Sequence, residues 1–256
     1  MIDKLIYFIK ERESIRIKKE GGDPKPWTDD PILRGYRFCN VRREDDKVSR
    51  WIHANWIWPN LYQPNLLPAI LLSRLINWPE TLEEIGFPDV WEPQEYARRI
   101  RARMERGDKT WTGAYMITAE HDGTPKEISV CKTVTACGKA KWRFDTCLDV
   151  WMDLQNLPRI GSFMAAQVIA DLKHTPLLAL ANDSWSFCAP GPGSQKGLNL
   201  ILNTPHKEWK QPEFRAEIIK LQDILPIELD AHNVQNCLCE FSKYIRGSSR
   251  SGYNGY

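Results

Sequence analysis

The stretch Leu157-Pro158-Arg159-Ile160-Gly161 decides the fold of this chain. The segment before it carries apolar side chains at the spacing of a helix, namely Phe144, Leu148, Trp151 and Leu154. The segment after it does the same with Phe163, Ala166, Val168, Ile169 and Leu172. Because Pro158 starts a turn between two helical patterns, the stretch predicts a helix-hairpin-helix element.

A hairpin of this kind can bind DNA through its backbone. It directs N–H groups at a phosphate, and the second helix adds the partial positive charge of its N-terminus. We therefore predict DNA contacts at the hairpin residues Arg159, Ile160, Gly161 and Ser162. The alternative is an ordinary turn between two helices that is stopped by a proline.

The residues downstream of the hairpin add to this prediction. Asp183 follows Gly161 by 22 residues, a spacing that resembles helix-hairpin-helix DNA glycosylases, in which an acidic residue acts on a base flipped out of the duplex. The next glycine-rich segment, 191–197, is predicted to be a surface loop. Its glycines would let an anion approach the backbone, which makes candidate ligands of Gly191, Gly193, Ser194 and Lys196. It is not a P-loop, because Gly-x-x-x-x-Gly-Lys-Ser/Thr is absent.

Composition places the chain among ordinary globular proteins. Of 256 residues, 42% are hydrophobic and 27% charged, enough for one large domain or two closely joined lobes. A net charge of +2 means that DNA binding must come from local patches. One basic run could contact phosphates or be a solvated helix face: Arg98, Arg99, Arg101, Arg103, Arg106 and Lys109.

The cysteine and histidine patterns argue against a metal site. The seven cysteines contain no Cys-x-x-Cys pair, and the five histidines are scattered, so we expect free thiols in a reducing cytosol and no bound metal. No apolar run approaches 18 residues, and the N-terminus lacks a signal-peptide pattern, so no membrane association is expected.

The whole pattern predicts a mainly α, glycosylase-like fold. Residues 1–246 are expected to form a single helical domain whose two lobes surround a cleft, followed by a flexible tail at 247–256. A small β-hairpin is predicted from 113–118 and 127–134. Helices are expected at 1–18, 43–57, 66–77, 93–107, 141–154, 161–173, 212–223 and 232–246, with a short helix near the end of 176–203.

Three blocks resemble one family. They are Tyr36-Arg-Phe-Cys-Asn-Val-Arg-Arg-Glu-Asp-Asp-Lys-Val-Ser49, the hairpin with Asp183 and the glycine-rich segment, and Asp230-Ala-His-Asn-Val-Gln-Asn-Cys-Leu-Cys-Glu-Phe-Ser-Lys-Tyr244. In this order they resemble the α-glutamyl/putrescinyl thymine pyrophosphorylases, also called amino-acid:DNA transferases. These phage enzymes share a helical domain with the 5-hydroxymethyluracil DNA kinases. A kinase would need a nucleotide site, which is not visible here, and this favours the transferase branch.

The resemblance implies a reaction in the cytoplasm of an infected bacterium. An amine, from an amino acid or polyamine, would displace pyrophosphate from the modified thymine of double-stranded DNA, leaving a C–N bond at the 5-methylene carbon. No cofactor is required, although Mg²⁺ could accompany pyrophosphate. We expect Asp183 to accept a proton from the amine or to hold its ammonium form.

The first and last blocks supply the other candidate residues. Arg37, Asn40 and Arg42 would bind pyrophosphate or an amino-acid carboxylate, unless they are solvated charges at the entry to a helix. Asn236, Glu240 and Lys243 share one helical stripe, with Asn236 as a ligand and the other two as catalytic groups. Alternatively, Glu240 holds an arginine of the first block in a structural ion pair.

Two other functions stay open. A monofunctional glycosylase would use Asp183 to excise a modified pyrimidine and leave abasic DNA. A non-catalytic module would use the hairpin only to bind DNA, so that Asp183 and Glu240 could be replaced without loss of function. An imine-forming lyase is disfavoured, since the stretch Ser162–Ala165 contains no lysine.

Overall fold

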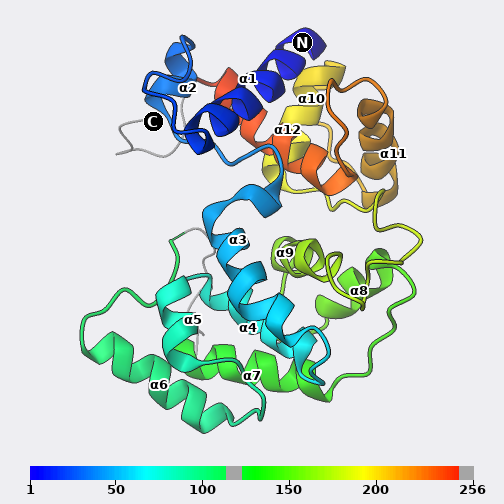
Figure 1. The fold of residues 1–256 in the computed structure, drawn as a ribbon. Coiled ribbons are helices and arrows are strands. Elements are labelled where there is room, and N and C mark those ends of the chain that lie inside the picture. Colours follow the sequence, from blue (N-terminus) through cyan, green and yellow to red (C-terminus); the bar gives the residue numbers. More distant parts are fainter. Residues whose placement is uncertain (114–122, 248–256) are drawn as a thin grey trace. The chain divides into compact units, whose positions relative to one another are not determined.

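A computed structural model describes residues 1–113 and 123–247 of the chain (Figure 1). The described residues form twelve α-helices joined by turns and short 3-10 or π segments, without a strand among them, which confirms the mainly α prediction. The chain divides into two compact units. Unit 1 combines 1–46 with the residues from Trp185 onward, and unit 2 is the intervening segment Lys47–Ser184. The cleft and the single-domain boundaries stay predictions, and the tail from 248 lies outside the described residues.

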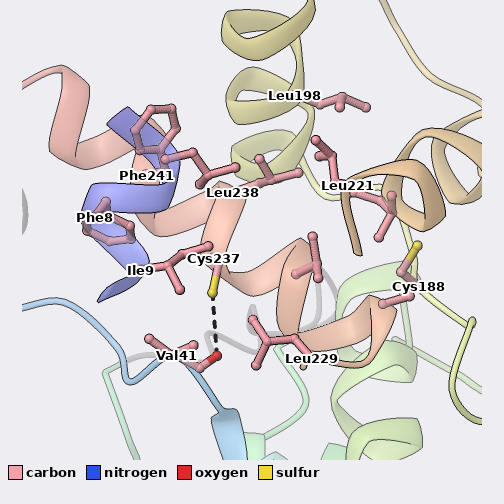
Figure 2. Packing of buried hydrophobic residues seen from close by; sticks show 14 of the residues in the cluster. Phe8, Ile9, Val41, Cys188, Leu198, Leu221, Leu229, Cys237, Leu238 and Phe241 are labelled. Carbon is pink, nitrogen blue, oxygen red and sulfur yellow. Dashed lines mark hydrogen bonds between the residues drawn. The ribbon is translucent and has the colours of Figure 1, made fainter. Parts of the chain in front are cut away.

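Unit 1 is built around its last helix. Its helices are α1 (Ile2–Glu20), α2 (Pro31–Gly35), the 3-10 turn η1 (Arg43–Asp45), α10 (Pro192–Leu202), α11 (Gln211–Gln222) and α12 (Ala231–Ile245). Figure 2 shows Leu238 and Phe241 of α12 in the apolar cluster between these helices. The rings of Phe8 and Phe241 lie 6.0 Å apart and both are buried, so the two ends of the chain share one core.

Unit 2 contains the hairpin. Its elements are α3 (Lys47–Ile52), the π segment η2 (His53–Ile57), η3 (Trp58–Asn60), α4 (Leu66–Ile76), α5 (Pro79–Ile85), α6 (Pro93–Glu105), α7 (Lys126–Lys139), α8 (Cys147–Leu154) and α9 (Ser162–Leu172). Every residue of α4 is buried, and α4 packs against α7 and α9 (Figure 1). The predicted helix at 43–57 is instead a succession of 3-10, α and π turns.

The second strand of the predicted β-hairpin is wrong, because residues 127–134 belong to α7. The β-branched residues there suggested a strand, yet the buried positions Val130, Val134 and Cys137 recur at intervals of four and three. This period buries one face of a helix, and burial outweighs the modest β preference of valine and threonine. The first strand, at 113–118, falls almost wholly outside the described residues.

The predicted loop at 191–197 is also wrong from Pro192 onward, where α10 begins. Proline fits the first turn of a helix. The glycines of α10 allow this helix to approach α12 closely. A Cβ at Gly197 would lie 2.2 Å from the carbonyl oxygen of Leu238, and one at Gly193 would lie 2.4 Å from Sγ of Cys239. These glycines therefore face a neighbouring helix, which is the physical reason for their presence.

Candidate functional site

The hairpin between α8 and α9 has the predicted form. The turn is fixed by hydrogen bonds from Ile160 N–H to the Leu157 carbonyl (3.2 Å) and from the Thr133 hydroxyl to the Pro158 carbonyl (3.0 Å). The indole N–H of Trp151 donates to the carbonyl of Ser162 and ties α8 to the start of α9. The hairpin is thus held by polar contacts as well as by its apolar faces.

The start of α9 presents backbone to the outside. Gly161 and Ser162 are exposed, α9 begins without a side-chain cap, and a Cβ at Gly161 would meet open space. Ile160 is buried, so its side chain supports the hairpin from within. Arg159, with φ of +65°, makes the left-handed bend. Uncapped N–H groups at an accessible helix start are the feature that DNA phosphates use.

Gly161→Ala tests the hairpin as a DNA contact. The φ of −91° suits alanine, so we expect the unfolding free energy to change by less than about 0.5 kcal/mol. DNA affinity should fall about fivefold, the loss of one backbone contact of about 1 kcal/mol, because the methyl group stands where a phosphate would approach. Fluorescence anisotropy with duplex DNA measures this. Gly35→Ala, whose Cβ also meets open space, is the control; equal affinities would make the hairpin an ordinary turn.

Asp183 caps the first helix of the hairpin. One carboxylate oxygen accepts the N–H of Cys147 at 2.6 Å and the other accepts that of Leu148 at 3.0 Å. Thr146, the N-cap residue, takes the N–H of Asp149 with its hydroxyl. Both oxygens of Asp183 therefore already stabilise the start of α8, which gives this residue a structural role. Its catalytic role stays a prediction.

Two substitutions separate these roles. Asp183→Ala should lower the free energy of unfolding by about 0.5–2 kcal/mol, the usual value of a helix cap. Asp183→Asn keeps an oxygen that accepts an N–H and should cost much less. Urea unfolding measures both. If Asp183→Asn is stable but inactive in base modification, the negative charge takes part in the reaction. If this variant is fully active, the role of Asp183 is limited to capping α8.

In unit 1, the polar stripe of α12 holds the segment 39–46. The Asn236 side chain donates to the carbonyl of Asn40 (3.2 Å), and Glu240 accepts the N–H of Cys39 (3.2 Å). The side-chain oxygen of Asn233 accepts the N–H of Arg43 (3.0 Å). The structure thus brings Asn40, Asn236 and Glu240 together, as an arrangement that fixes a backbone.

Among the described residues, Glu240 anchors the first block through the backbone of Cys39 and not through an arginine. Its other oxygen lies 2.5 Å from Nζ of Lys243. Burial lowers the pKa of Lys243, but the charge and hydrogen bond of Glu240 outweigh it and raise that pKa above its ordinary value. Lys243 is therefore a fixed cation and is poorly suited to accept a proton.

The remaining candidates in unit 1 differ in accessibility. Arg37 and Lys196 are exposed. Arg42 donates to the carbonyl of Glu228 (3.1 Å) and to Glu13 (3.5 Å). Ser194 is fully buried, and its hydroxyl bonds both N–H and carbonyl of Gly191, so it closes the first turn of α10 and is not placed to bind an anion.

The predicted basic run on α6 is largely neutralised within unit 2. Glu95 pairs with Arg98 and Arg99, and Glu84 pairs with Arg103 and Arg106. These ion pairs favour the solvated-face interpretation over phosphate binding.

A buried charged network in unit 2 is a feature that sequence reasoning missed. Arg74 of α4 bonds both carboxylate oxygens of Asp171 of α9, each at 2.5 Å. Its other contacts are the hydroxyl of Ser49 (3.1 Å) and the side-chain oxygen of Asn77 (3.2 Å). Nε2 of His53, in the π segment, lies 2.9 Å from Asp171. All five side chains are buried, and π turns are common at functional sites.

Asp171 is ionised in this network. Burial alone would raise the pKa of its carboxyl, but the charge of Arg74 and the hydrogen bonds from Arg74 and His53 outweigh burial and lower it. One sequence signal could have drawn attention to the site: polar residues Gln167 and Asp171, four apart, interrupt the otherwise apolar face of α9.

The described part of the chain offers neither a metal-binding cluster nor a membrane-spanning helix. No group of three or more His, Cys, Asp or Glu side chains there could hold a metal ion. Nor does any helix in the described ranges have the length and apolarity to cross a bilayer.

The described residues form a helical domain in which a hairpin joins α8 to α9. The chain belongs to the family described as the helical domain of 5-hmdU DNA kinase, whose model matches residues 1–253. A protein of Bacillus phage SP10 named 5-hmdU DNA kinase is 28% identical over 284 residues. The match covers 94% of this chain but 44% of the phage protein, so the chain spans less than half the length of that relative. No solved structure matches the chain.

Proposed function

We propose that this protein modifies thymine bases of phage DNA in the cytoplasm of the infected bacterium. The observation that carries the proposal is the family match over residues 1–253, since the family takes its description from an enzyme of 5-hydroxymethyl-deoxyuridine in DNA. The helix-hairpin-helix in unit 2 supports it with an accessible helix start of the kind that binds a DNA backbone.

The reaction we propose is the displacement of pyrophosphate by an amine. The nitrogen lone pair of an amino acid or polyamine forms a bond to the 5-methylene carbon, and the C–O bond breaks with its electrons leaving on pyrophosphate. Cations that neutralise the departing charge would favour this step. The three blocks that resemble amino-acid:DNA transferases support the assignment. No cofactor is needed beyond a Mg²⁺ ion that could travel with pyrophosphate.

Unit 1 offers the cations for that purpose. Arg37 and Lys196 are exposed, and Lys243 stays charged beside Glu240. Asn40 and Asn236 contribute through position, because they fix the backbone of the block that carries Arg37 and Arg42. Of the predicted residues, we propose that Arg37, Lys196 and Lys243 bind the anion.

A second candidate follows from the name of the SP10 relative, a 5-hmdU DNA kinase. Under it, the chain serves as the DNA-recognising helical part of a phosphorylating enzyme. The two candidates share the DNA substrate and differ in what is attached to the base: phosphate for the kinase and an amine for the transferase.

Mass spectrometry of digested nucleosides separates the candidates. In one reaction, DNA with pyrophosphorylated 5-hydroxymethyluracil is incubated with the protein and with a mixture of amino acids and putrescine. In a parallel reaction, the protein is incubated with 5-hydroxymethyluracil DNA and ATP. We expect a nucleoside with the mass of an amine adduct, together with free pyrophosphate. A phosphorylated nucleoside from the second reaction would favour the kinase, and abasic sites would favour a glycosylase. DNA that is bound but unchanged would leave a binding module.

A further inference from the structure

The two ring nitrogens of His53 have different surroundings. The Nε2 atom lies 2.9 Å from Asp171, and within the described residues Nδ1 makes no hydrogen bond. The residue is buried, at 4% exposure. A neutral imidazole that is held through one nitrogen keeps a lone pair on the other, and such a lone pair can accept a proton.

The contacts of Asp171 determine which ring nitrogen of His53 carries the hydrogen. Arg74 donates to both oxygens of Asp171, and the ionised carboxylate accepts a hydrogen bond from Nε2–H of His53. The hydrogen on Nε2 leaves a lone pair on Nδ1. A carboxylate that fixes the tautomer of a histidine in this way is a common feature of general bases.

The surroundings of His53 suit a flat or cationic ligand. The indole of Trp58, 55% exposed, lies with its centroid 5.7 Å from the imidazole, and the exposed ring of His174 lies 5.2 Å away. The π segment His53–Ile57 lies between α3 and η3 and precedes Trp58 directly. Aromatic faces attract both nucleobases and ammonium groups.

We propose that His53 is the general base that deprotonates the incoming amine, with Asp171 and Arg74 as positioning residues. This inference rests on the proposed transferase function. Nδ1 takes one proton from the ammonium group, and the freed lone pair forms the bond to the 5-methylene carbon. Pyrophosphate departs with the electrons of the broken C–O bond. The product amine keeps its remaining hydrogens, and the imidazolium returns its proton to solvent.

The tautomer of His53 can be read without any substrate. Long-range ¹H–¹⁵N NMR of the full chain labelled on histidine should show Nε2 protonated and Nδ1 bare at the assay pH. The reversed tautomer, or an imidazolium, would overturn the proposal, because Nδ1 would then have no lone pair to offer. His53→Gln identifies the signal.

Kinetics test the proton transfer itself. His53→Gln keeps a donor toward Asp171 but cannot take up a proton, and His53→Ala leaves a space for added imidazole. In single turnovers that form the amine adduct, both should be slowed at least about 100-fold, with equal DNA affinity. Imidazole should restore His53→Ala at least about tenfold and leave His53→Gln unchanged. The control is His206→Gln in unit 1, which should react like the unaltered protein.

The outcomes distinguish this inference from the function on which it rests. If the unaltered protein forms no amine adduct, both are overturned. If it forms the adduct and His53→Gln reacts within about threefold of it, the transferase stands and His53 is structural. Slowing without rescue of His53→Ala by imidazole also overturns the role as a base, since a purely structural loss would not respond to an added proton acceptor.

Discussion

Replacing Arg74 by methionine is expected to lower the free energy of unfolding by about 3–5 kcal/mol, the range for removal of one partner of a buried ion pair. Both side chains of the pair with Asp171 are almost fully buried, at 2% and 1% exposure. Without the guanidinium, an ionised carboxylate stays in the core, and His53 is its one remaining partner among the described residues. Ser49 and Asn77 also lose a donor. Asp171→Asn should be similarly harmful, because it leaves the arginine charge uncompensated.

Urea unfolding at pH 7 measures these losses. The control is the double variant Arg74→Met with Asp171→Leu, which removes both charges and should cost less than the sum of the two single changes. An additive result would mean that the charges do not interact.

Acid should weaken the same network. The pKa of Asp171 is lower in the folded protein than the value of about 3.9 in an unfolded chain. Its contribution is therefore present above about pH 4 and is lost as the pH falls below this value, because the unfolded chain takes up the proton first. Unfolding curves between pH 7 and pH 3 should show a smaller loss for Asp171→Asn than for the unaltered protein. Equal losses would assign the acid sensitivity to other carboxylates.

The second large effect is expected at Gly197. Alanine normally stabilises the interior of a helix relative to glycine by about 1 kcal/mol. Here its Cβ would lie 2.2 Å from the carbonyl oxygen and 2.7 Å from the carbonyl carbon of Leu238, so the backbones of α10 and α12 must separate. We expect a net loss of at least about 2 kcal/mol, the range for overpacking of a core. Thermal unfolding measures it.

Gly193 provides the matched control on the same helix. Its added Cβ would meet Sγ of Cys239 at 2.4 Å, and a side-chain atom can rotate away more easily than a backbone carbonyl. Gly193→Ala should therefore cost less than Gly197→Ala. In a Cys239→Ala background it should be neutral or stabilising. A stable Gly197→Ala protein would contradict the close approach of the two helices.

Periodicity predicted the helices well where one face is apolar and tertiary contacts agree with it. The expected ranges 66–77, 93–107 and 161–173 differ by one or two residues from α4, α6 and α9. The prediction failed where residue composition suggested a different structure from the apolar periodicity. Valine and threonine suggested a strand in α7, and glycine with proline suggested a loop at the start of α10. The glycines reflect a neighbouring helix, which a single sequence does not display.

The candidate site was harder to predict, because its contacts are long-range. Arg74 and Asp171 are 97 residues apart, and His53 and Asp171 are 118 apart. Local patterns did indicate the exposed hairpin residues such as Gly161, because their predicted role involves only the backbone of the hairpin itself. They did not indicate that Asp183 meets the amides of α8, or that Ser194 turns inward to close α10. Such partners depend on the packed fold.

The division of unit 1 between the two ends of the chain affects the order of folding during synthesis. Unit 2 leaves the ribosome complete before Trp185 and the helices that follow it. Until then, Phe8 lacks its apolar neighbours on α12, and the segment 39–46 lacks the α12 side chains that bind its backbone. The first 46 residues must therefore wait, with apolar surface uncovered, while 138 residues fold between them and their partners. Chaperones bind apolar surface of this kind, and α12 covers it once this helix has emerged.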